Sequence, residues 1–248
     1  MLTRTFAHID GITSGIEKLL SERGITQWHD LLSQLHLFSE IPKTKLEKIK
    51  NGLTSSIEAF AKNDFHFFKQ LLKPKEHWRL CNMGKICYVD IETTGLSKWS
   101  NEITMIGVYD GTLPHIYVSG KNLQEAHEKI REFDIVVTFN GKQFDLPFIE
   151  HHFSHSYDVV HLDLRYMLKE LGLTGGLKSI EYQLGICRDA DLQGVDGFEA
   201  VRLWSQYKRG NQAALKKLLR YNEQDIVNLK TLLGYYLDKK LGNYVGKN

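Results

Sequence analysis

Residues 85–95 read Lys-Ile-Cys-Tyr-Val-Asp-Ile-Glu-Thr-Thr-Gly, a short apolar run that ends in two acids. Its apolar, β-branched and aromatic residues predict a strand that ends before Gly95. Strand side chains alternate, so Asp90 and Glu92 share one face while Val89 and Ile91 share the other. Two neighbouring carboxylates repel each other, so either a divalent cation lies between them or they mark a solvated strand end followed by an ordinary turn.

The segments after this strand predict a mixed sheet flanked by helices. Two further strands follow closely, at 103–109 and at 115–119 behind the turn Asp110-Gly111, and three strands in quick succession form an antiparallel meander. Beyond the meander the pattern predicts a helix at 122–131, a strand at 135–139, a helix at 146–152, a strand at 159–162 and then only helices, ending in a long one at 212–240. The predicted fold class is therefore α/β.

The region before residue 76 shows helical patterns only. Helices are predicted from Ser14 to Gly24, from about Thr26, from Thr44 to a break at Asn51-Gly52, and over 54–72. Lys73-Pro74-Lys75 stops the helical pattern. We therefore expect a small all-α domain at 1–75, followed by the α/β domain at 76–248.

Composition excludes several classes of protein. The 248 residues are 42% hydrophobic and 25% charged, close to globular averages, which excludes wholesale disorder and fibrous architectures. Apolar runs are too short to cross a bilayer, and the first ten residues show no secretory signal. The three cysteines have no zinc-like spacing and fit a reducing compartment. We expect a soluble, cytoplasmic protein that is not bound to a membrane.

Two more acidic motifs follow in the chain. Asn140 to Asp145 comes directly after the strand at 135–139 and places Asp145 at a helix start, where plain N-capping is the alternative. Tyr221 and Asp225 lie four residues apart in the last helix and so share one face, where a solvated polar face is the alternative.

Taken together, the motifs resemble those of a known enzyme family. Asp90-Ile91-Glu92-Thr93-Thr94-Gly95, the segment Asn140 to Asp145 and Tyr221-xxx-Asp225 are similar to the three exonuclease motifs of the DEDD superfamily, in the subtype whose third motif carries tyrosine. Leu184-Gly185-Ile186 with Arg188, and Trp204, are similar to the YprB-like branch. The resemblance spans about residues 85 to 235 and implies an RNase H-like fold.

The resemblance also implies roles for the acids and the tyrosine. Two divalent cations, Mg²⁺ or Mn²⁺, would stabilise the attacking and leaving oxygens of a phosphodiester. Asp90 would bridge both ions, Glu92 and Asp225 would complete one site, and Asp145 would hold the second ion directly or through water. Tyr221 would orient the attacking water.

Further residues are candidates for binding the substrate. Thr93, Thr94 and Leu96 stand where family members present backbone amides and an apolar wedge to the terminal nucleotide. Asn140 and Phe144 are expected to flank the same pocket, with core packing as the alternative for Phe144. Lys178 follows Gly175-Gly176 near a helix start and is a candidate for phosphate contact.

The N-terminal region has a resemblance of its own. His8 to Thr13, the following helix and Gly24-Ile25 are similar to a helix-hairpin-helix DNA-binding module. Such modules carry a second glycine in the hairpin where this chain has Thr13, whose Cβ obstructs a close approach of phosphate. Phosphate anchoring and a merely structural helical cap both remain open.

The resemblance implies a metal-dependent 3′→5′ exonuclease that acts on nucleic acid, and the hairpin-like N-terminus favours single-stranded DNA over RNA. Three alternatives remain open: an RNA exonuclease, a structure-specific endonuclease on the same fold, and a nucleic-acid-binding module without activity. The net charge of +2 does not by itself indicate a nucleic-acid partner.

Overall fold

The structure is a computed structural model that describes residues 1–192 and 197–245. It divides into two compact units, Met1–Gly84 and Lys85–Asn248. The sequence places the domain boundary after Lys75, and the chain between these two points forms a 3-10 helix, η3 (Pro74–Leu80), and a turn. No helix within the described ranges is long and apolar enough to span a bilayer.

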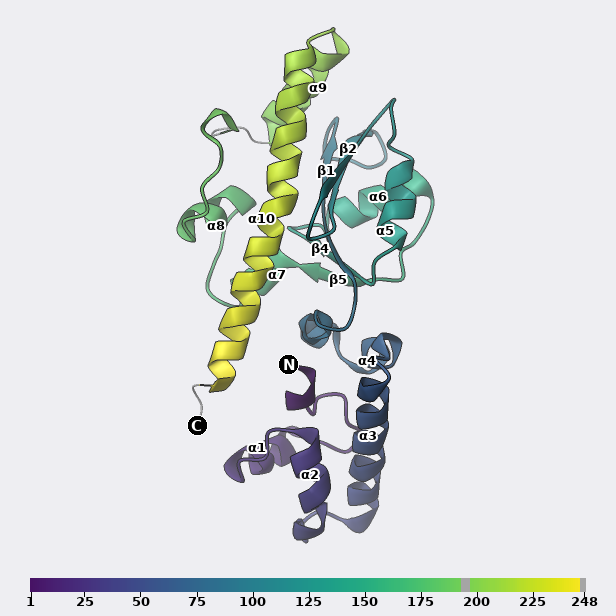
Figure 1. The fold of residues 1–248 in the computed structure, drawn as a ribbon, viewed down its shortest axis with the longest axis vertical. Helices are drawn as coiled ribbons and strands as arrows, with labels where there is room; N and C mark the ends of the chain where they lie inside the picture. Colours follow the sequence, from purple (N-terminus) through teal and green to yellow (C-terminus); the bar gives the residue numbers. More distant parts are fainter. Residues whose placement is uncertain (193–196, 246–248) are drawn as a thin grey trace. The chain divides into compact units, whose positions relative to one another are not determined.

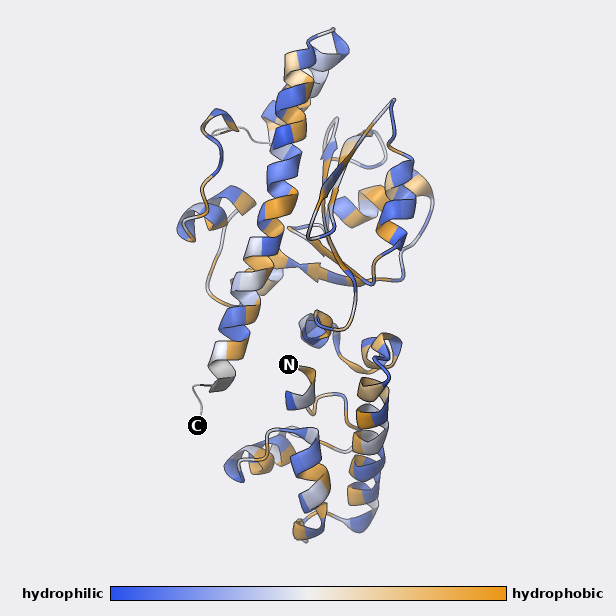
Figure 2. Ribbon diagram, viewed as in Figure 1, coloured by the Kyte–Doolittle hydropathy of each residue, from blue (hydrophilic) through white to orange (hydrophobic). Residues whose placement is uncertain are grey.

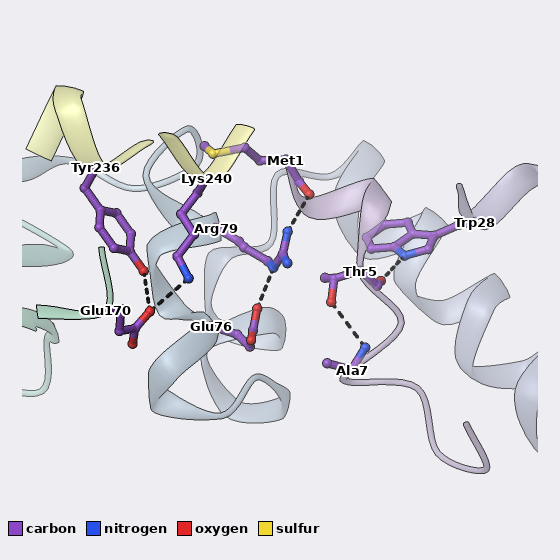
Figure 3. Close-up of polar contacts among 9 residues, drawn as sticks. All are labelled: Met1, Thr5, Ala7, Trp28, Glu76, Arg79, Glu170, Tyr236 and Lys240. Carbon is purple, nitrogen blue, oxygen red and sulfur yellow. Dashed lines mark hydrogen bonds and ion pairs between the residues drawn. The ribbon is translucent and has the colours of Figure 1, made fainter. Parts of the chain in front are cut away.

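The first unit is helical. Its elements are η1 (Leu2–Arg4), α1 (Ser14–Glu22), α2 (Trp28–Gln34), η2 (Leu35–Leu37), α3 (Lys43–Ala61), α4 (Phe65–Leu71) and η3. The buried indole of Trp28 stacks on Phe68 at 5.7 Å between ring centroids and donates a hydrogen bond to the Thr5 carbonyl at 2.7 Å (Figure 3). Arg79 is also buried, and its guanidinium donates to Glu76 and to the Met1 carbonyl, so the N-terminus is tied to the end of this unit (Figure 3).

The helix break predicted at Asn51-Gly52 is wrong, because α3 runs through both residues. Ile49 and Leu53 on either side are fully buried, and their burial outweighs the low helix propensity of the pair. A side chain at Gly52 would also crowd Ile9, which packs there. The break lies at Asn63, whose φ is 52°, and Asp64 caps the next helix by accepting the Phe67 N–H at 3.0 Å.

In the hairpin-like turn before α1, Gly11 adopts a backbone conformation that favours glycine. Its φ is 91°, and Thr13 is the extended N-cap residue of α1. The side chain of Thr13 makes no capping hydrogen bond within the described chain. Whether this turn binds phosphate stays a prediction.

The second unit contains a five-stranded mixed sheet, which confirms the predicted fold class. The strands are β1 (Ile86–Thr93), β2 (Ile103–Tyr109), β3 (Pro114–Val118), β4 (Ile135–Thr138) and β5 (Val160–Asp163). They lie in the order β3-β2-β1-β4-β5. The first three form the antiparallel meander, whereas β4 and β5 add in parallel, each reached through a helical connection.

Helices cover both faces of the sheet (Figure 1). On one face α5 (Glu125–Arg131) and α6 (Asp145–Phe153) pack on β1 and β2 through a core that includes Val89, Ile91, Ile130 and Ile149. On the other face lie α9 (Gly197–Lys208) and the long α10 (Gln212–Val245). The remaining helical elements are α7 (Leu164–Lys169), α8 (Leu177–Gln183) and η4 (Ala190–Leu192). Figure 2 shows apolar residues along the strands, as a sheet buried on two faces requires.

Polar contacts hold α10 in position at two points along the helix. Near its C-terminal half, Glu170 at the end of α7 accepts hydrogen bonds from Tyr236 at 3.1 Å and Lys240 at 2.8 Å (Figure 3). Nearer the sheet, the amide of Asn222 donates to the Asp90 carboxylate at 2.9 Å. The second contact needs a glycine in β2, because a Cβ on Gly107 would collide with Asn222 Oδ1 and crowd Ile226.

We therefore expect Gly107→Ala to destabilise the protein by about 1–3 kcal/mol, the usual cost of overpacking. The matched control is Gly234→Ala on the exposed side of α10, where an added methyl group meets open space. That variant should gain about 0.5–1 kcal/mol from helix propensity. Urea unfolding measures both changes, and equal effects of the two substitutions would contradict the close packing at Gly107.

Candidate active site

The acidic pair stands at the C-terminal end of β1, on the side of the sheet that faces α10. Val89 and Ile91 point into the core with α5 and α6, so Asp90 and Glu92 point the other way, as the strand alternation predicts. A register shift between Glu92 and Thr93 ends the regular pairing with β2. Such irregularities re-aim side chains at sheet ends.

A third carboxylate comes from α10. Asp225 is 4% exposed, and one oxygen each from Asp90, Glu92 and Asp225 lie within 4.8 Å of one another. Across residues 1–192 and 197–242, this is the one group of three or more His, Cys, Asp or Glu side chains with such spacing. The structure thus brings together residues that the sequence separates widely.

Asp145 adds a fourth carboxylate from the first turn of α6. It is 4% exposed and lines the same pocket as the other three. Its Oδ1 accepts the backbone N–H of Ile91 at 3.1 Å, which ties the start of α6 to the acidic strand. Asp145 is therefore not the N-cap residue, a position that Phe144 holds.

Tyr221 lies one helical turn before Asp225 and faces the same pocket. Lys178 of α8 donates from its Nζ to the Tyr221 hydroxyl at 2.9 Å, and the ammonium lies 4.5 Å from the ring centroid. The next residue, Asn222, holds Asp90. Sequence reasoning missed Asn222, because its contact with Asp90 depends on how α10 lies against the sheet.

Arg188, on the segment between α8 and η4, is the cation that pairs with the site. Its Nη2 donates to Asp225 Oδ1 and, at 2.7 Å, to Glu181, while its Nε donates to Glu181 at 2.5 Å. The side chains of Arg188, Glu181 and Asp225 are only 8%, 2% and 5% exposed. Asn228 completes the network with a hydrogen bond to Glu181 at 2.9 Å. One oxygen of Asp225 is thereby fixed by Arg188.

Burial and mutual repulsion favour the neutral form of the acids. Burial raises the pKa of Asp90 and of Glu92 well above the usual range, and the charges of Asp225 and Asp145 raise both further. Burial also raises the pKa of Asp145, to about 7. Burial raises the pKa of Asp225 as well, although the Arg188 guanidinium opposes that shift.

The chemistry of this donor set fits a divalent cation. Clustered carboxylate oxygens that repel one another are the ligands that Mg²⁺ and Mn²⁺ prefer, and a cation between them removes the repulsion. The buried acidic cluster therefore fits the use of divalent metal. The number of ions and their identity belong to the proposal below.

A pocket of about 680 Å³ opens above the acids. Five of the six residues predicted to bind substrate line it: Thr93, Thr94, Leu96, Asn140 and Phe144. The sixth, Lys178, lines a neighbouring pocket of about 500 Å³ and contacts Tyr221 instead. The pocket wall also includes Phe198 and Val201 of α9, which sequence reasoning did not find.

Asn140 owes its position to Asp163, the residue that ends β5. It has a left-handed φ of 66°, and its backbone N–H donates to Asp163 Oδ1 at 2.8 Å. Asp163 also caps α7 by accepting the Arg165 N–H. The Asn140 side chain accepts from Arg165 at 2.6 Å, so the loop before Asp145 is held on two sides.

The fold and the site define a member of the RNase H superfamily. The model of that superfamily matches residues 87–237, more than half of the chain and the whole of the acidic centre, and the chain belongs to it.

No curated protein matches the sequence. Similar solved structures include the family B DNA polymerase of Pyrobaculum calidifontis, with 14% identity over 63% of this chain and a TM-score of 0.49. This chain spans only 24% of that polymerase. Brucella melitensis NrnC bound to pGG is also similar, with 19% identity over 66% of this chain and 78% of NrnC and a TM-score of 0.46.

Because native carboxyls keep protons that the unfolded chain releases above about pH 4, the metal-free protein should lose stability as pH rises from about 4 through about 7. Asp90→Asn removes one of the repelling charges. In a chelating buffer at pH 8, we expect this variant to have a higher Tm than the wild type. Adding Mn²⁺ should raise the Tm of the wild type only.

The matched control for that experiment is Glu223→Gln, an exposed acid on the same helix as Asp225. Its Tm should stay within the small range typical of surface substitutions. A lower Tm for Asp90→Asn in chelator would show that repulsion among the acids does not limit stability.

Arg188→Met leaves Glu181 and Asp225 buried without their counter-ion. Breaking a buried ion pair from one side costs about 3–5 kcal/mol, and denaturant unfolding measures the loss. Arg220→Met is the control, because Arg220 pairs with Asp189 and Asp191 from the same segment but at the surface. A similar loss of stability in both variants would contradict the special position of Arg188.

Proposed function

We propose that the protein is a divalent-metal-dependent 3′→5′ exonuclease of the DEDD superfamily, of the tyrosine subtype and the YprB-like branch. The observation that carries this proposal is the convergence of Asp90, Glu92, Asp145 and Asp225 with Tyr221 in one pocket. Acids whose pKa is raised by burial and by neighbouring like charges are concentrated at functional sites. The superfamily membership adds a fold on which such acids support cleavage of phosphodiesters.

Each acid has a role that its position suggests. Asp90, Glu92 and Asp225 would hold one cation, and Asp145, in the first turn of α6, would hold a second together with Asp90, directly or through water. Divalent cations at such a site activate water and stabilise the charge that develops on phosphate oxygens. Asn222 and Arg188 orient Asp90 and Asp225, so the oxygens that would face a cation are fixed before it binds.

Tyr221 would position the attacking water. Burial raises the pKa of its hydroxyl, with a further contribution from Asp225, so the phenol stays protonated near neutral pH. Its oxygen already accepts a hydrogen bond from Lys178, which leaves its proton for a water in the pocket. A protonated phenol orients the water and does not act as the base.

The pocket wall supports a nucleotide as the ligand. Leu96 and Phe198 are 81% and 79% exposed, and both line the pocket above the acids. Apolar groups held open to solvent beside a metal site suit a base next to its phosphate. We propose single-stranded DNA as the substrate and a DNA-binding role for the helix-hairpin-helix-like region at 1–75, with RNA as the alternative that the assay must test.

The assay uses single-stranded DNA and RNA of one sequence, labelled at the 3′ or at the 5′ end and incubated with Mg²⁺ or Mn²⁺. We expect 5′-labelled DNA to shorten in steps of one nucleotide. Discrete larger fragments would indicate an endonuclease. Retained binding without cleavage under either metal would indicate a binding module.

Two substitutions test the roles of the site residues. Asp90→Asn should abolish cleavage, because it removes a metal ligand. Tyr221→Phe keeps the ring but loses the hydroxyl that orients the water, and should reduce kcat by about 10²-fold with little change in KM. Glu223→Gln should cleave as the wild type does. Full activity of Asp90→Asn would place the chemistry elsewhere.

A further inference from the structure

The most exposed apolar side chains of the described chain gather around the acidic centre. Leu96, Trp99, Tyr182 and Phe198 are between 77% and 87% exposed, and each lines a pocket. Leu96 and Phe198 line the central pocket, whereas Trp99 and Tyr182 each line a separate neighbouring pocket. Exposed apolar residues are ordinary when scattered singly, but a set that borders adjoining pockets indicates a binding surface.

The pocket of Trp99 combines an aromatic platform with basic groups. It has a volume of about 440 Å³ and lies between the β1–β2 loop and α6. The His151 ring lies edge-on to Trp99 with 4.7 Å between centroids, and the Lys98 ammonium is 5.1 Å from the indole centroid. His152 lines the pocket too, and Glu102 is its one acid. An indole beside an ammonium and imidazoles suits a base with its phosphate.

The loop that carries Trp99 is braced from within. Asn101 donates to the Ser97 carbonyl at 3.2 Å and accepts from the Thr94 hydroxyl at 3.3 Å. The loop closes so tightly that a Cβ on Gly95 would collide with the Asn101 side chain. Leu96 and Trp99 are therefore held in a fixed relation, one in each pocket.

Helix α6 forms a continuous wall along the same two pockets. Phe144 lines the central pocket, while Phe148 and His151, one and two turns later, line the pocket of Trp99. From Phe144 to His151 the helix rises about 10 Å. A strand covers that distance in about three nucleotides at the spacing of a duplex strand, and in fewer when extended.

The pocket of Tyr182 is separated from the central pocket by side chains that already bind each other. Lys178 and Arg188 line the pocket of Tyr182, and they bind Tyr221 and Asp225 of the central pocket. Side chains that are already bonded thus stand between Tyr182 and the acids. Toward Trp99, by contrast, α6 gives a strand that leaves the centre one continuous wall along both pockets.

We propose that the pocket of Trp99 is a second nucleotide-binding subsite, in which Trp99 stacks on a base of the single strand upstream of the cleaved nucleotide. This inference rests on the proposed function and specifies its substrate as strands of several nucleotides rather than dinucleotides. Lys98 and His151 contact the phosphate of the stacked nucleotide.

Fluorescence anisotropy tests the subsite with labelled oligothymidylates of two, four and eight nucleotides, in Mg²⁺, on the Asp90→Asn background. We expect Trp99→Ala to weaken binding of the eight-nucleotide strand by about tenfold, the scale of one lost stacking contact. Binding of the dinucleotide should change less than about twofold, and Trp99→Phe should restore most of the affinity for the long strand. Because Trp99 is 77% exposed, its removal should leave the Tm unchanged.

Tyr182→Ala is the matched control, an aromatic side chain of similar exposure in the other neighbouring pocket. An equal loss of affinity at all three lengths, no loss with Trp99→Ala, or a length-dependent loss with Tyr182→Ala would each overturn the proposal. Because the experiment measures binding, its result does not depend on whether the protein cleaves the strand. Intact cleavage without a Trp99 effect rejects only the subsite, and a Trp99 effect without cleavage by the wild type rejects only the exonuclease.

Discussion

The second unit must compensate the mutual repulsion of four carboxylates that lie together at one end of its sheet. Asp90, Glu92, Asp145 and Asp225 come from three elements, and no fold gathers such charges without compensation. The compensation within the protein is partial. Three of the carboxylates accept a hydrogen bond: Asp145 from the Ile91 N–H, Asp90 from the Asn222 amide and Asp225 from the Arg188 guanidinium. What remains is an attraction for a small, hard cation.

The same contacts also fix the position of α10. Asn222 reaches Asp90 only because β2 carries Gly107 where the helix crosses, and Arg188 reaches Asp225 only because Glu181 holds its other edge. A small residue in a strand (Gly107) and a buried acid in α8 (Glu181) therefore affect the positions of Asp90 and Asp225. Changes at either position reach the acids through the placement of α10.

The strands along the chain, and the face of β1 that carries Asp90, could be predicted from the sequence, because both depend on local pattern. Ile103–Tyr109 is a strand within its predicted bounds, and the alternation that separates Asp90 from Ile91 holds. The break at Asn51-Gly52 was wrong, because the pair has low helix propensity but lies between buried residues. Propensity is visible in a sequence, whereas burial depends on what packs opposite.

The contacts between side chains could not be predicted. Arg188 and Asp225 are 37 residues apart, and neither spacing nor composition indicates that they meet. Lys178 is predicted to contact phosphate because of the glycines before it, and nothing in the sequence indicates that it also lies against the ring of Tyr221. Phe198 carries no motif, and only the position of α9 brings it to the pocket. Such contacts depend on how distant helices pack together.

The long reach of α10 has a consequence for the growing chain. Asn222 and Asp90 are separated by 132 residues, and Tyr221 and Asp225 lie equally far along. Chains are synthesised from the N-terminus, so the sheet and the first three of the four acids leave the ribosome well before the helix that completes the centre. During that interval the acidic centre lacks both Asp225 and the Asn222 amide that holds Asp90. The centre is therefore complete only when the last helix has docked.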